Sequence, residues 1–64
     1  MRAKQKPTKN DCYRKIVEAR REMGRLRIAL EEGDPDKINY AVQEVELTSW
    51  EATKTALAYI GYGY

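Results

Sequence analysis

The stretch EEGDPD, residues 31–36, decides the fold because it ends one helix and starts another with almost no chain between them. Gly33 suits the left-handed position that follows a helix, Asp34 suits an N-cap, and Pro35 suits the first position of the next helix. So short a connection places two consecutive helices antiparallel to each other. The sequence therefore predicts an all-α fold, an antiparallel two-helix hairpin.

Other breaks in the chain set the outer ends of the two helices. Pro7 precedes Thr8 and Asn10, either of which can cap the start of the first helix. The glycines of the ending YIGYGY should stop the second helix near Ile60. We expect one domain over residues 1–64, with a basic arm at 1–8, helices at 9–32 and 35–60, and a tyrosine and glycine tail at 61–64.

The chain is short for a stable core. A domain of 64 residues buries only about 60% of the surface that its unfolded chain exposes, so a disulfide, a metal or a partner usually supports it. Cys12 is the only cysteine and there is no histidine, so neither an internal disulfide nor a structural zinc site is expected. We predict no metal or other cofactor, and expect support from another copy of the chain or another protein.

Membrane and secretion signals are missing from the sequence as given. No apolar run approaches the ~20 residues of a membrane span, and the N-terminus MRAKQKPTKN has no apolar segment typical of a signal peptide. A lone cysteine suits a reducing compartment. The sequence predicts a cytoplasmic protein with no membrane partner.

Apolar residues recur at the spacing of a coiled-coil seam in both expected helices. The first row is Cys12, Ile16, Ala19, Met23, Leu26 and Leu30, and the second is Ile38, Val42, Val45, Ser49, Ala52, Ala56 and Tyr59. We expect the two rows to face each other, with large side chains of the first opposite small ones of the second. Cys12 is then a small core residue rather than a nucleophile.

The second helix also carries apolar residues on its far side. At 100° per residue, Tyr40, Leu47, Trp50 and Leu57 lie about 130–150° from the predicted seam. Burying one large apolar side chain contributes roughly 1.5–3 kcal/mol, and contiguous exposed apolar patches usually mark interfaces. We predict that another copy or a different protein covers these four residues, giving a four-helix or larger bundle.

The tail offers two interpretations. Tyrosines interleaved with glycines are common at interfaces, so Tyr62 and Tyr64 could extend the predicted contact surface. The alternative is that the tail, or the N-terminal segment, folds over Trp50 and Leu57 and covers them within the chain.

Residues 16–60, IVEARREMGRLRIALEEGDPDKINYAVQEVELTSWEATKTALAYI, resemble the small YaaL-like proteins. The shared signals are a basic Glu-Ala-Arg segment at 18–20, a hinge and helix start reading DPDKINYAV at 34–42, and an aromatic-rich second helix. Asn39 stands where these proteins have an acidic residue, and Trp50 where they have a small one. The resemblance implies a helical hairpin and names no activity, because the functions of these proteins are largely unknown.

The sequence favours a role without catalysis. There is no histidine, and tyrosines with a pKa near ~10 are poor acid–base groups at neutral pH. Glu44 and Glu51 lie one heptad apart, a spacing typical of a solvated acidic stripe, and the isolated glycines form no phosphate-binding loop. We predict no catalytic residue, no enzymatic activity and no small-molecule substrate.

Charge is divided unevenly along the chain, although the formal net charge is only +2. Residues 1–32 carry ten Lys/Arg and five Asp/Glu, and residues 33–64 carry two and five. An exposed basic strip that could follow phosphates comprises Lys4, Lys6, Arg14, Arg21 and Arg25. The counter-interpretation is local pairing of these arginines with nearby carboxylates, which gives an ordinary charged surface.

These observations together predict a non-enzymatic protein-interaction module, such as a small adaptor, inhibitor or regulator. It would act through the apolar far side of the second helix and the tyrosine tail. The alternative is a nucleic-acid-binding helical bundle that uses the basic arm and the arginines of the first helix.

Overall fold

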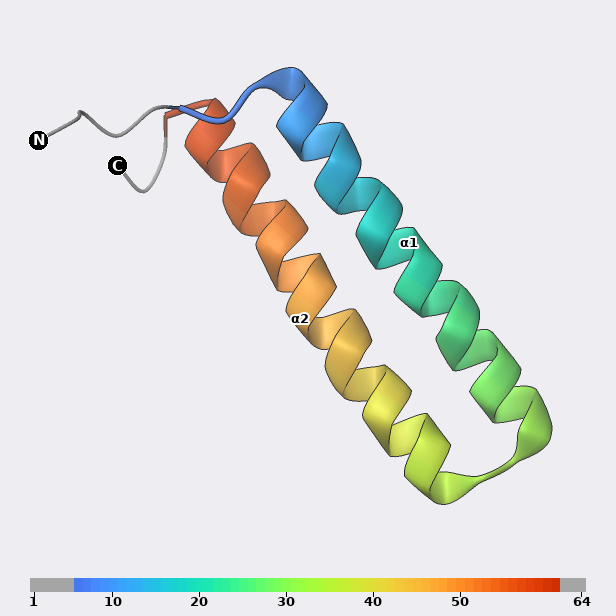
Figure 1. The fold of residues 1–64 in the computed structure, drawn as a ribbon. Helices are drawn as coiled ribbons and strands as arrows, with labels where there is room; N and C mark the ends of the chain where they lie inside the picture. Colours follow the sequence, from blue (N-terminus) through green and yellow to red (C-terminus); the bar gives the residue numbers. More distant parts are fainter. Residues whose placement is uncertain (1–5, 62–64) are drawn as a thin grey trace, which may run out of the picture.

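The computed structural model describes residues 6–61, and this part of the chain consists of two helices without any strand. Helix α1 spans Lys9–Glu32 and helix α2 spans Pro35–Tyr59. The helices lie antiparallel and side by side along their whole length (Figure 1). The predicted all-helical hairpin is thereby confirmed.

The turn between the helices has the geometry that its residues predict. Gly33 adopts a left-handed backbone conformation with φ 75°, and its N–H donates to the carbonyl of Ala29 at 2.9 Å. The carboxylate of Asp34 accepts a hydrogen bond from the backbone N–H of Asp36 at 3.0 Å, which caps α2. The ammonium of Lys37 contacts the carboxylate of Glu32 at 3.0 Å and ties the two helix ends together.

A capping box fixes the start of α1. The Thr8 hydroxyl accepts from the backbone N–H of Asp11 at 3.1 Å, and the Asp11 carboxylate accepts from the backbone N–H of Thr8 at 2.8 Å. Thr8 is therefore the N-cap and Asn10 belongs to the helix. At the other end of the chain α2 stops at Tyr59, and Ile60 is its C-cap.

Small side chains form the interface between α1 and α2. The buried residues of the described part are Cys12, Ala19, Ala29, Ala41 and Ala58. Cys12 has the core position that the sequence predicts, and its thiol lies 3.9 Å from the carbonyl oxygen of Thr55 on the opposite helix. No side chain larger than these is buried anywhere in residues 6–61.

The predicted seam is wrong for its bulkiest members. Ile16, Met23 and Leu30 are 44–58% exposed, and Val42, Ala56 and Tyr59 are exposed as well. Cys12, Ala19 and Leu26 do face α2, but the half-buried Lys15 and Glu22 take the positions between them, and the buried Ala29 follows Leu26. Alanines let the two backbones approach closely, and this leaves no room for a row of large side chains between the helices.

Gly33 in the turn and Gly24 inside α1 give a matched pair of substitutions that tests the turn. Gly33→Ala should lower the free energy of unfolding by about 1 kcal/mol, because a Cβ disfavours the left-handed conformation. Gly24→Ala should raise it by about 0.5–1 kcal/mol, because Gly24 lies inside α1 with nothing within 4 Å of the added Cβ. Urea unfolding followed by circular dichroism, at one protein concentration, measures both. Shifts of the same sign would contradict this description of the turn.

Candidate functional site

The apolar far side of α2 is the candidate site, and we call Tyr40, Leu47, Trp50 and Leu57 the outer stripe. The structure leaves all four side chains 45–65% exposed. They follow one another at intervals of seven, three and seven residues, so they lie on one side of α2 along most of its length. The outer stripe is therefore a surface feature of the hairpin, as the sequence predicts.

Packing of α2 against α1 determines which side becomes the outer stripe. The side of α2 that faces α1 carries the buried Ala41 and the half-buried Ile38, Val45 and Ala52. Thr48 shares that side, where its hydroxyl donates to the carbonyl of Glu44 at 2.8 Å and so has a partner within the helix. Because these residues occupy the contact with α1, the large aromatic and leucine side chains point away from it.

A cation interrupts the outer stripe beside its largest residue. The ammonium of Lys54 lies 4.9 Å from the centre of the Trp50 ring, within the range of a cation–π contact. Lys54 follows Trp50 by four residues and Leu47 by seven, so it stands on the same side of α2. A partner that covers Trp50 must therefore also accommodate or displace this lysine.

The N-terminal segment reaches only the edge of the outer stripe. Pro7 lines a small hollow together with Lys15, Trp50, Lys54 and Ala58. Trp50 is nevertheless 59% exposed. Within residues 6–61, the N-terminal segment thus covers only a small part of the outer stripe. Tyr62 and Tyr64 lie outside the described residues.

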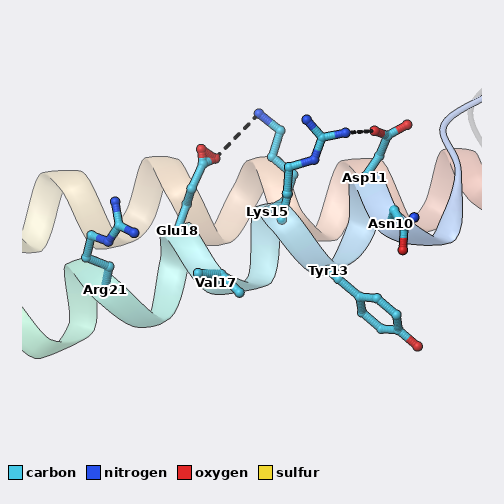
Figure 2. Close-up of a pocket in the computed structure, with 8 residues that line it drawn as sticks. Asn10, Asp11, Tyr13, Lys15, Val17, Glu18 and Arg21 are labelled. Carbon is cyan, nitrogen blue, oxygen red and sulfur yellow. Dashed lines mark hydrogen bonds and ion pairs between the residues drawn. The ribbon is translucent and has the colours of Figure 1, made fainter.

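The predicted basic strip lies on α1. A shallow surface pocket near the start of α1 is lined by Tyr13, Arg14, Val17 and Arg21 among others (Figure 2). Arg14 contacts the Asp11 carboxylate at 2.9 Å, and Arg25 contacts the Glu22 carboxylate at 3.4 Å. Two of the three arginines thus have a carboxylate partner one turn away.

Arg21, Lys6 and Lys4 are the remaining members of the strip. The ion pairs found among residues 6–61 do not include Arg21, and the nearby Glu18 contacts Lys15, which is outside the strip, at 3.8 Å. Lys6 is exposed, and Lys4 lies outside the described residues. The backbone N–H of Thr8, with help from Arg14, holds the pKa of Asp11 below its usual value, so this carboxylate stays charged beside Arg14 at neutral pH.

Chemistry-bearing groups do not gather in the part of the chain that the structure describes. No three Cys, Asp or Glu side chains of residues 6–61 lie close enough together to hold a metal ion. Cys12 is buried between the helices and unpaired. Neither described helix has the length and apolar character needed to cross a membrane.

A second exposed apolar surface was not predicted from the sequence. It contains Ile16, Met23 and Leu30, which the heptad pattern assigned to the contact between the helices. The signal for it lies in α1, where Lys15, Glu22 and Ala29 repeat at the same spacing one residue earlier.

Comparison of the chain with protein families, with curated proteins and with solved structures gave no match.

Trp50 reports directly on whether the outer stripe is covered. In dilute native protein we expect acrylamide to quench its fluorescence nearly as well as in the urea-unfolded chain, because more than half of the side chain is exposed. Protection that appears only at higher protein concentration would mean that another copy covers the stripe. Strong protection at every concentration would contradict the exposure of Trp50 in the hairpin.

Proposed function

We propose that this chain is a non-enzymatic, cytoplasmic protein-interaction module, a small adaptor, inhibitor or regulator, and that it works as part of a four-helix or larger bundle. The observation that carries the proposal is the outer stripe, a row of large exposed apolar side chains on a hairpin whose own interface buries only alanines and a cysteine. The absence of histidine from the sequence supports a role without acid–base catalysis.

Energetics favour a partner for the outer stripe. Its side chains are about half exposed, so covering one of them contributes roughly half of the 1.5–3 kcal/mol that full burial gives. Each alanine in the interface between α1 and α2 contributes only about the 0.8 kcal/mol of a single buried carbon group. The half-buried Leu26, Ile38 and Val45 add to the hairpin's own contact. A partner on the outer stripe would add a further contribution from four side chains that this contact leaves exposed.

The composition of the outer stripe fits a helical partner surface. Large apolar side chains at intervals of three, four and seven residues are the anchors with which a helix docks into an apolar groove. Tryptophan and tyrosine carry a disproportionate share of binding energy at such contacts. Trp50 and Tyr40 are therefore the residues on which partner binding should depend most.

Paired substitutions test the outer stripe. Trp50→Glu with Leu57→Glu should abolish capture of a specific protein partner from extracts of the source cells, because a partner would have to bury two unpaired charges. The matched control is Tyr13→Glu with Val17→Glu, two similarly exposed apolar residues of α1. Circular dichroism checks that both variants remain helical. If the Trp50 and Leu57 variant captures the same protein as the unmodified chain, the outer stripe is not the contact surface.

Nucleic-acid binding is the alternative function, and the local ion pairs weaken its case. The guanidinium groups of Arg14 and Arg25 are each within 3.4 Å of a carboxylate, which offsets much of their attraction for phosphate. We expect no measurable binding of a fluorescent single-stranded RNA at physiological salt. Tight binding that weakens steeply with salt and is lost when Arg14, Arg21 and Arg25 become serine would favour this alternative instead.

A further inference from the structure

Part of the predicted seam stays outside the contact between the helices, and we call it the Met23 face. It contains the exposed Ile16, Met23 and Leu30 from α1, and the exposed Val42 and Ala56 with the half-buried Ser49 from α2. One apolar pocket at the end of this face is lined by Lys9 and Cys12 of α1 and by Ala56, Leu57 and Tyr59 of α2, so the face borders the outer stripe at Leu57. Lys9 stands one heptad before Ile16, and Ala56 one heptad after Ser49, so the two rows lie on the same side of the hairpin.

The opposite side of the hairpin has a different character. One surface pocket there is lined by Arg25, Ile28 and Glu32 of α1 and by Lys37 and Tyr40 of α2, and another by Lys15, Trp50, Glu51 and Lys54. Charged and apolar side chains are thus mixed on that side, where Ile28 and Tyr40 are exposed, whereas the Met23 face consists of apolar side chains and one serine. The Met23 face is therefore a second apolar surface, besides the outer stripe, that association can cover.

The two rows of the Met23 face are complementary in size to each other. The row on α1 is bulky, with isoleucine, methionine and leucine, and the row on α2 is small, with valine, serine and alanine. A second copy, turned by a twofold axis parallel to the helices, would place the bulky row of each chain on the small row of the other. Such self-complementarity is what a symmetric dimer interface requires.

Charges at the edge of the Met23 face match in the same arrangement. Within the hairpin, Cys12 lies across from Thr55. Because the helices are antiparallel, Arg20, eight residues after Cys12, is level with Leu47, eight residues before Thr55. Arg20 follows Ile16 by four residues and Glu46 follows Val42 by four, so each stands at the outer edge of its row. With the two copies side by side at the same height, Arg20 of each chain meets Glu46 of the other.

The ion pairs inside the hairpin leave these two groups available. Four of the five pairs found among residues 6–61 join residues of α1, the fifth is Lys37 with Glu32, and none includes Arg20 or Glu46. The other symmetric arrangement, with α1 on α1 and α2 on α2, makes the two α1 helices antiparallel and would bring Arg20, near the middle of α1, against Arg20 of the other chain. Like charges at that edge disfavour it.

We propose that the Met23 face binds a second copy of this chain, with α1 of each chain packed on α2 of the other in an antiparallel four-helix bundle. This inference rests on the bundle in the proposed function and names the surface that would form it, which is the Met23 face rather than the outer stripe. Dimerisation in this way buries Ile16, Met23 and Leu30 at the centre of the bundle. It leaves Tyr40, Leu47 and Trp50 of the outer stripe exposed on both chains for another protein, with Leu57 at the edge of the dimer contact.

Sedimentation equilibrium over a hundredfold dilution tests the dimer. The unmodified chain should have twice its chain mass of 7.4 kDa, and Met23→Glu should raise the dissociation constant at least about 100-fold, because it places an unpaired charge in the interface. Met23 is about half exposed in the hairpin, so the variant should stay helical by circular dichroism. Trp50→Glu, a charge on the outer stripe, is the control and should leave the mass unchanged.

Charge reversal tests the arrangement of the helices. At low salt, Arg20→Glu and Glu46→Arg should each weaken the dimer by about 5- to 20-fold, since the twofold axis repeats the pair, and the double variant should recover the original dissociation constant. A monomeric unmodified chain, or a dimer broken by Trp50→Glu and not by Met23→Glu, would overturn the proposal. So would a double variant that is weaker than both single ones. None of these outcomes changes the partner-capture result, which tests the outer stripe separately.

Discussion

The close contact of α1 with α2 across alanine side chains is the constraint on which the other features depend. Ala19, Ala29 and Ala41 bring the two backbones near each other, and a contact made of such small groups buries little apolar surface. The consequence is a hairpin in which every isoleucine, leucine, methionine and tryptophan of the described part remains at least partly exposed. A chain with so small an interior has most of its potential hydrophobic stabilisation outside its own fold.

The same packing sorts the surface into regions of different character. The surface of α1 carries ion pairs between residues one turn apart. These pairs satisfy charges locally and are screened by salt. The Met23 face and the outer stripe are both apolar and border each other only at Leu57, which lines a pocket with Cys12 and Ala56. Tyr40, Leu47 and Trp50 lie away from the Met23 face, so the proposed contact between copies would leave them open to another protein.

This division of surfaces explains how so small a chain could act as an interaction protein. A bundle built through the Met23 face would provide the rigid support that a hairpin of two helices lacks. The outer stripes would then stand on opposite sides of the assembly, and each would present Trp50 and Tyr40 on a fixed helix. Rigid aromatic anchors lose little conformational freedom on binding, which is why they dominate many protein contacts.

The sequence by itself determined the features that depend on neighbouring residues. Gly33, Asp34 and Pro35 specify the turn, and apolar periodicity specifies two helices with Tyr40, Leu47, Trp50 and Leu57 away from the contact. Only the tertiary structure decided how far each helix is rotated about its own axis. In α1 two heptad rows lie one residue apart, Ile16-Met23-Leu30 and Lys15-Glu22-Ala29, and hydrophobicity favours the first. Close backbone packing favours the second, because alanine and the slender stems of lysine and glutamate fit where large branched side chains would hold the helices apart.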